Sequence, residues 1–183
     1  SLYGKHKSPR IVNTTAFNSL KEYKPFIENR IEEHSFDLLM TNPPFKGKVL
    51  ASDRNELGLS KPNDFEIMDG REKVEIIDLF IERYWQLLKD GGKLAVVVPD
   101  GFLFSRDHKL GRKYLFKHFQ IEAIISLPQH RFVPYGAGVK TSIIFATALG
   151  ENKTPDKSKK IFIASPEHIG YDSKGNKDIN DLP

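Results

Sequence analysis

The sequence contains no cysteine. This absence excludes disulfide bonds and zinc sites built from cysteine thiolates, and it fits a reducing compartment, where disulfides are rare. No apolar run approaches the roughly 20 residues that a helix needs to cross a membrane, and no signal-peptide pattern is visible. We therefore expect a cytoplasmic protein with no membrane partner.

A glycine-rich nucleotide-binding loop is also missing. The only G-x-G stretch is Gly136–Gly138, which precedes a predicted strand, whereas the dinucleotide fingerprint needs a strand before it and a helix after it. Four histidines show no metal-ligand spacing with nearby acidic residues and are assigned to surface or core positions: His108, His118, His130 and His168. The sequence predicts no metal site.

The chain length of 183 residues suggests one domain or part of one, and an apolar fraction of 39% with 13 phenylalanines is enough for a core. The net charge of +4 favours a polyanionic partner only weakly. Much of the excess falls in a segment that we interpret as a solvated linker: Lys153, Lys157, Lys159 and Lys160. Charge alone does not identify nucleic acid as the partner.

Helical periodicity is clearest over Glu72–Lys89, where a broad apolar stripe precedes a left-handed stop at Gly91-Gly92. A second helix is expected at Arg112–Phe119, and a third within Lys21–His34, broken near Pro25. The polar stretch Phe45–Asp69 is too long for a simple connection, and we interpret it as a substrate-facing loop.

Apolar runs of strand length predict an α/β sheet. The run Phe36–Met40 is continuous, as expected of a parallel strand that is covered on both faces. The other predicted strands are Lys93–Val98, Ile121–Leu127, Val139–Thr147 and Ile161–Ala164. Because residues 128–138 are too few for a helical crossover, the strand after them is expected to run antiparallel.

An unusual turn, Asn42–Phe45, follows the first of these strands. Each of its two prolines fixes φ and lacks an N–H, and the residue before a proline is held extended. The turn therefore presents the Asn42 amide, the free carbonyl of Pro43 and the Phe45 ring in a fixed relation. This arrangement suits a planar group with an amino substituent, although an ordinary structural turn is an alternative.

Ligands of open α/β sheets bind beyond the carboxyl ends of the strands. Asn42–Phe45, Pro99–Phe104 and Pro128–Gly138 are all predicted to lie at that edge. We therefore expect the three loops to form one crevice.

The Asn-Pro-Pro-Phe sequence after a strand resembles the signature of S-adenosylmethionine-dependent amino-methyltransferases. More narrowly, the chain is similar to N6-adenine DNA methyltransferases, above all to the modification subunits of type I restriction–modification systems. The similarity covers most of residues 1–150 and is carried by four segments: Phe36–Phe45, Leu87–Gly92, Pro99–Leu103 and Val139–Phe145. Methyltransferases of glutamine and guanine use similar tetrapeptides.

This resemblance implies that Asn42, Pro43, Pro44 and Phe45 form the catalytic motif. The side-chain oxygen of Asn42 and the carbonyl of Pro43 would accept both hydrogens of the adenine amine, and Phe45 would stack on the base after it is flipped out of DNA. Phe132 would supply a second stacking face, or else simply pack its loop.

The same resemblance implies S-adenosylmethionine as the cofactor, bound by Asn18, Asn42 and Pro43, and DNA with specificity and restriction subunits as partners. Asn18 replaces the aspartate of a family Asp-Ser-Leu motif. The family's glycine-rich cofactor turn and the acidic residue that ends its second strand are both missing.

The implied fold is an α/β, Rossmann-like class I methyltransferase whose sheet order is 3-2-1-4-5-7-6. The strands of this chain would be strands 4, 5, 7 and 6, which are one contiguous half of that sheet. Residues 1–150 would then be the C-terminal part of a catalytic domain. Residues 151–160 would be a linker and 161–183 the start of a following region. Such a fragment is expected to bind the cofactor weakly or not at all. The alternatives are a methyltransferase of a protein glutamine or an RNA base, and a non-catalytic interaction domain.

Overall fold

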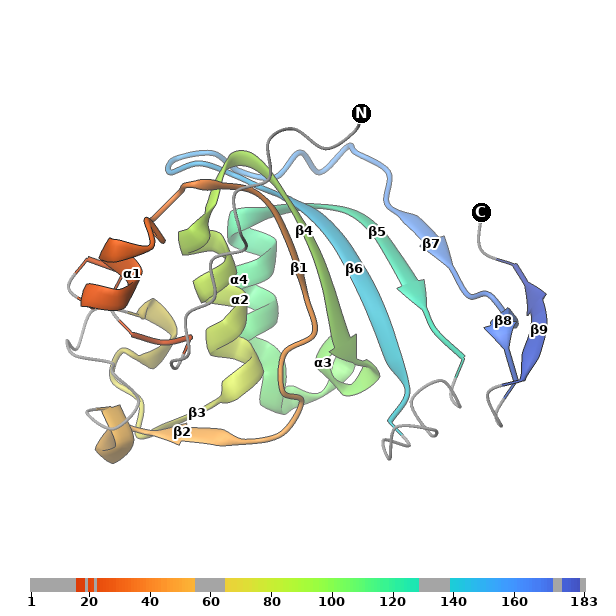
Figure 1. Ribbon diagram of the computed structural model, residues 1–183, viewed down its shortest axis with the longest axis horizontal. Coiled ribbons are helices and arrows are strands. Elements are labelled where there is room, and N and C mark those ends of the chain that lie inside the picture. Colours follow the sequence, from red (N-terminus) through yellow and green to blue (C-terminus); the bar gives the residue numbers. More distant parts are fainter. Residues whose placement is uncertain are drawn as a thin grey trace.

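A mixed five-stranded sheet in the order β1-β4-β6-β5-β7 organises the chain (Figure 1). The computed structural model describes residues 16–18, 20–21, 23–54, 65–128, 139–172 and 176–181. Its helices are α1 (Lys24–Glu28), α2 (Ile76–Leu87), α3 (Asp100–Phe104) and α4 (Lys109–His118), with 3-10 turns η1 (Ala51–Arg54), η2 (Glu66–Met68) and η3 (Arg106–His108). Its strands are β1 (Phe36–Thr41), β2 (Lys48–Leu50), β3 (Lys73–Glu75), β4 (Leu88–Pro99), β5 (Phe119–Ser126), β6 (Thr141–Ala148), β7 (Phe162–Ala164), β8 (Ile169–Tyr171) and β9 (Lys177–Asn180).

The pairing of the four main strands confirms that the strand after residues 128–138 runs antiparallel. β1 pairs in parallel with β4, and β6 pairs antiparallel with both β4 and β5. The sheet also continues past residue 160, because β7 pairs in parallel with β5. The numbering of these strands within a larger sheet and the division of the chain at residue 150 stay predictions.

The core lies between the sheet and the pair α2 and α4, which pack side by side on one of its faces (Figure 1). Successive side chains of β4 point to opposite faces of the sheet, and those of Leu94, Val96 and Val98 are buried against the helices. From α2, Ile77 and Ile81 are fully buried. Each fully buried side chain of this size stabilises the fold by about 1.5–3 kcal/mol.

One prediction about β1 is wrong. Its parallel pairing is as expected, but only one face is covered: Leu38 is 54% exposed and Met40 76%. β1 is an edge strand that pairs only with β4 among the described strands, and no described element covers the face that carries these two side chains. A continuous apolar run therefore does not show that both faces of its strand are covered.

Helix α2 is shorter than predicted. Residues 73–75 belong to β3, which forms an antiparallel pair with β2 and buries Val74 opposite Val49. Gly91 has the expected positive φ of 79°, but it lies inside β4, and the residue that ends the helix is the extended Leu88. The stretch 45–69 is thus partly regular, and residues 55–64 lie outside the described part of the chain.

Three shorter elements also differ from expectation. Pro25 lies in the first turn of α1, where its missing N–H costs no helical hydrogen bond, so it begins a helix instead of breaking one. Residues 100–104, predicted as a loop, form the single-turn helix α3. Helix α4 begins three residues earlier than predicted, at Lys109, directly after η3. None of the described helices has the length and apolar character needed to cross a membrane.

Helix α2 buries three charged side chains because it is enclosed by the sheet, α4 and η2. Asp78 accepts a hydrogen bond from the Gly111 amide (2.9 Å), and its other oxygen lies 3.1 Å from His108 Nδ1. Arg83 donates to the carbonyls of Phe17 (3.1 Å) and Asn18 (3.0 Å). These contacts fix α4 and the N-terminal segment to α2.

The third buried charge, Glu82, accepts hydrogen bonds from the amides of Glu66 (2.6 Å) and Ile67 (2.9 Å), so it caps η2. Burial raises the pKa of Glu82 from 4.5 to about 7, against the opposing effect of these two hydrogen bonds. Between these pH values the folded chain binds a proton that the unfolded chain does not. The stability that Glu82 contributes is therefore fully present below pH 4.5 and is lost as the pH rises to about 7.

We expect the Glu82→Gln variant to lose this part of the pH dependence. The difference in unfolding free energy between wild type and variant should change by about 3 kcal/mol between pH 4.5 and 7, since each pKa unit corresponds to about 1.4 kcal/mol. Urea titrations across this range measure the difference. The exposed Glu28→Gln variant is the control, and a flat difference curve for Glu82→Gln would refute the assignment.

Candidate active site

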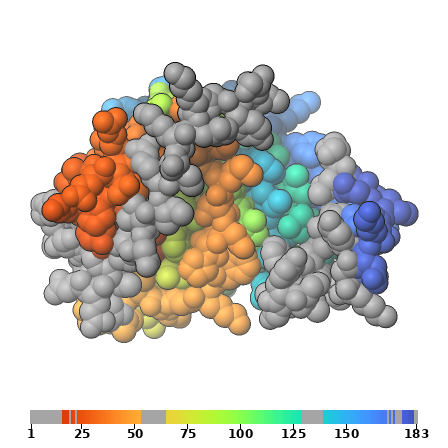
Figure 2. All heavy atoms as spheres, viewed as in Figure 1, coloured from red at the N-terminus to blue at the C-terminus, as the bar shows by residue number. Residues whose placement is uncertain are grey.

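The Asn42–Phe45 turn lies at the carboxyl end of β1, on the surface of the molecule. Pro43 is buried, Phe45 is half-buried, and Asn42 and Pro44 are exposed. Figure 2 shows β1 and the segment after it, in orange, open on the face in view. The proline side chain thus anchors the turn while the Asn42 amide remains accessible.

Both ends of the turn are fixed to α2. On the near side, the Thr41 hydroxyl lies 3.0 Å from the Tyr84 hydroxyl, which is buried. On the far side, the Gly47 carbonyl accepts a hydrogen bond from the Ile76 amide (2.9 Å), and Gly47 has a φ of 134° that favours glycine. Burial raises the pKa of the Tyr84 phenol, so this group stays protonated and available to hydrogen-bond.

A second wall of the site is built where β4 ends and β6 begins. Asp100 accepts a hydrogen bond from the Ser142 hydroxyl (2.8 Å), and its other carboxylate oxygen lies 3.5 Å from Lys140 Nζ. The Asp100 amide donates to the Lys140 carbonyl, and the Leu127 amide donates to the Thr141 carbonyl. The ends of β4 and β5 are thus tied to the start of β6.

These ties confirm part of the predicted convergence of loops. β1, β4 and β5 run in the same direction, so the strands that Asn42 and Pro128 follow and the strand that Pro99 ends all terminate at one edge of the sheet. The rest of the third loop, residues 129–138, lies outside the described residues, and Phe132 with it. The stacking role of Phe132 stays a prediction.

Sequence reasoning missed two features of this site. Tyr84 interrupts an otherwise apolar helical stripe, and that interruption was a signal for a buried hydroxyl with a specific partner. The second missed feature is Asp100, which accepts a hydrogen bond from Ser142, 42 positions away in the chain. No local pattern could have revealed that second contact.

A cavity of about 370 Å³ lies beside Thr41, between the N-terminal segment, β1 and α2. Its lining is mostly apolar and consists of Ala16, Leu20, Phe26, Ile31, Phe36, Thr41, Phe80, Arg83, Tyr84 and Leu87. Asn18, predicted to bind the cofactor, is only 6% exposed, and its segment is fixed to Arg83 at the edge of this cavity. An apolar space with the hydroxyls of Thr41 and Tyr84 fits a purine ring, whereas the described part of its lining holds no carboxylate to bind a ribose.

The sheet and site define a class of protein. The fold is similar to that of a Listeria monocytogenes protein described as a class I S-adenosylmethionine-dependent methyltransferase, with a TM-score of 0.56 and 23% identity, over 76% of this chain and 39% of that one. The fold is therefore that of a class I methyltransferase. A family model for N-6 DNA methylase matches residues 8–182, and the chain belongs to this family.

Two similar proteins come from type I restriction–modification systems. The Escherichia coli type I restriction enzyme EcoEI methylase subunit is 37% identical over 116 residues, which are 63% of this chain and 21% of that subunit. A chain from a structure describing complex assembly of the type I R-M system has a TM-score of 0.58 and 26% identity, over 83% of this chain and 28% of that one. The chain thus spans between a fifth and two fifths of the length of these two proteins and the Listeria monocytogenes protein.

Proposed function

We propose that the protein containing this chain transfers a methyl group from S-adenosylmethionine to the N6 amine of a flipped-out adenine in DNA. One observation carries the proposal: a chain of the N-6 DNA methylase family holds an Asn-Pro-Pro-Phe turn at a strand end, with both ends of the turn hydrogen-bonded to α2. Such anchoring supplies the fixed geometry that transfer to a weak nucleophile requires.

The adenine amine is a weak nucleophile because its lone pair is delocalised into the ring. In the proposed site the Asn42 side-chain oxygen and the Pro43 carbonyl accept its two hydrogens, which holds the amine pyramidal with its lone pair free. Both acceptors also stabilise the positive charge that develops on the amine. Phe45, half-buried beside them, stacks on the base.

The cofactor supplies an electrophilic methyl group when it is bound. We propose that the cavity beside Thr41 and the adjoining Asn18 segment hold its adenine ring, and that Asn42 and Pro43 border its reactive end. The apolar lining and the two hydroxyls support this placement.

We further propose that the protein acts as the modification subunit of a restriction–modification system, together with specificity and restriction subunits. The named relatives support this assignment: one is a methylase subunit of a type I restriction enzyme, and another comes from a structure on complex assembly of the type I R-M system. A methyltransferase of protein glutamine or of an RNA base would use a similar tetrapeptide but would not be expected to match an N-6 DNA methylase model over residues 8–182.

A substrate comparison tests the proposal. The full-length protein, with its natural partners where it needs them, is incubated with S-adenosylmethionine that carries a labelled methyl group and with equal masses of DNA, RNA and denatured protein. We expect label in DNA alone. Label in RNA or protein would replace the proposed substrate, and no transfer to any of the three would favour the non-catalytic alternative.

A further inference from the structure

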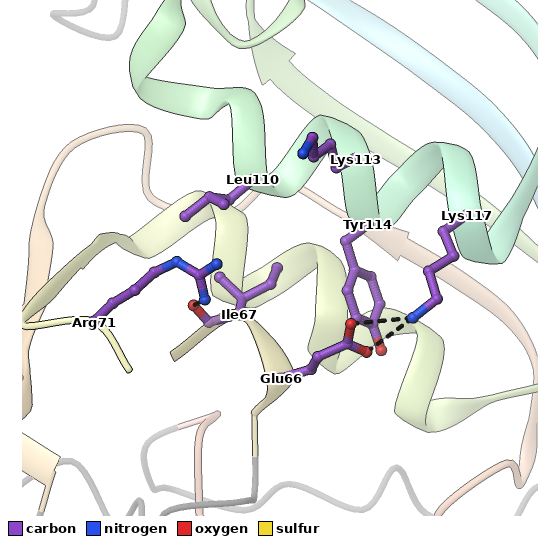
Figure 3. Close-up of a pocket in the computed structure, with 7 residues that line it drawn as sticks. All are labelled: Glu66, Ile67, Arg71, Leu110, Lys113, Tyr114 and Lys117. Carbon is purple, nitrogen blue, oxygen red and sulfur yellow. Dashed lines mark hydrogen bonds and ion pairs between the residues drawn. The ribbon is translucent and has the colours of Figure 1, made fainter. Parts of the chain in front are cut away.

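A groove of about 220 Å³ separates η2 from helix α4. Figure 3 shows its lining: Glu66, Ile67, Arg71, Leu110, Lys113, Tyr114 and Lys117. Three of these side chains are cationic and one is anionic, so the groove carries a formal charge of +2. The groove lies outside the crevice formed by Asn42 and the ends of β4 and β5.

Helix α4 continues this positive surface. Its ten residues include no acidic side chain and four basic ones: Lys109, Arg112, Lys113 and Lys117. Lys109, Lys113 and Lys117 are spaced by four residues, so they form one stripe along the helix with a rise of about 6 Å between neighbours. All three are exposed. Like charges at this spacing destabilise a helix, so helix stability does not account for the stripe.

The opposite wall of the groove fixes a guanidinium group. Arg71 Nη1 donates to the carbonyls of Ile67 (2.9 Å) and Asp69 (3.0 Å), which holds the side chain at the rim. The N–H groups on the other guanidinium nitrogens take no part in these two bonds. Among the described residues of the lining, Glu66 is the only carboxylate, and both of its oxygens lie within 3.2 Å of Lys117 Nζ. Within the described residues, Lys109 and Lys113 form no ion pair.

We propose that this groove and the lysine stripe bind the phosphate backbone of DNA, as a contact separate from the crevice that holds the target base. One DNA strand presents a phosphate about every 3.4 Å along the helix axis, so lysines about 6 Å apart match roughly every second phosphate. Helix α4 begins directly after α3 and η3, at the same sheet edge as Asn42. A duplex engaged at the crevice can therefore reach the Lys109 end of the stripe.

The test uses the full-length protein that contains the chain and a fluorescent duplex of arbitrary sequence, with affinity measured by anisotropy from low to high salt. The Lys109→Gln/Lys113→Gln variant should bind more weakly at low salt by at least about tenfold, and the slope of log affinity against log salt should fall by about 1.8, or 0.9 per lost phosphate contact. The matched control is Lys157→Gln/Lys160→Gln, which removes the same charge from exposed positions of the linker. The control should change the slope by less than about 0.5.

Equal slopes for the two double variants would overturn the proposal, because net charge and not the groove would then govern binding. Poly-glutamate replaces the duplex in a parallel measurement. A contrary result is that poly-glutamate binds as tightly as DNA and loses as much affinity in the Lys109→Gln/Lys113→Gln variant. In that case the groove is a site for acidic protein and the proposal is wrong. The anisotropy measurement contains no S-adenosylmethionine and scores binding alone, so a failure at the groove is distinguishable from a failure of the proposed methyl transfer.

Discussion

Replacing Asn42 with alanine is expected to lower the rate of methyl transfer by about a thousandfold, since the loss of one preorganised hydrogen-bonding group at a reacting centre typically costs 10²–10³ in rate. The variant loses the acceptor that holds the amine pyramidal and stabilises its developing charge. Because Asn42 is exposed, the unfolding free energy should change by less than about 0.5 kcal/mol. Turnover with labelled cofactor and a urea titration measure the two quantities.

A conservative variant provides the matched control for this result. Asn42→Asp keeps a side-chain oxygen that can accept the amine hydrogen, so it should retain clearly more activity than Asn42→Ala. If the alanine variant instead turns over at a near-normal rate in the complete enzyme, Asn42 has no part in the chemistry.

Substituting Gly111 with alanine is expected to destabilise the fold by about 3 kcal/mol, although alanine is the better helix former by about 1 kcal/mol. A Cβ at this position would lie 2.6 Å from Asp78 Oδ1 and 3.0 Å from its Cα. Asp78 is fully buried and accepts the Gly111 N–H. Relieving the overlap costs about 1–3 kcal/mol, and weakening a hydrogen bond to a buried carboxylate adds a similar amount.

Gly101 in α3 is the matched control, because no atom lies within 4 Å of the Cβ that alanine would add there. The Gly101→Ala variant should be as stable as the wild type or more stable by up to about 1 kcal/mol. Chemical denaturation of both variants tests the pair. Equal midpoints for Gly111→Ala and Gly101→Ala would show that the contact with Asp78 is unimportant.

The antiparallel direction of β6 could be predicted from the sequence because the connection of residues 128–138 is short, whereas the expected order of the strands came from the family resemblance. The exposure of Leu38 and Met40 could not be predicted, because it depends on whether another element covers that face of the sheet. The extent of α2 was overestimated because Val74 fits an apolar helical stripe and an alternating strand equally well.

The candidate turn was predictable because the geometry of two consecutive prolines is local. Its support was not, because the contact between Thr41 and Tyr84 joins residues 43 positions apart and the bond from Ser142 to Asp100 joins residues 42 apart. The membership in the N-6 DNA methylase family confirms the resemblance inferred from the motif. The roles of Asn18 and Phe132 and the weak binding of the cofactor stay predictions.

Analysis of the nucleosides in methylated DNA tests the central claim most directly. DNA is incubated with the full-length protein and S-adenosylmethionine, digested to nucleosides and examined by mass spectrometry. The proposed function predicts N6-methyl-2′-deoxyadenosine as the only new nucleoside, and its absence when Asn42 is alanine. A methylated cytosine or guanine, or methyladenine that forms equally well with the Asn42→Ala variant, would contradict it.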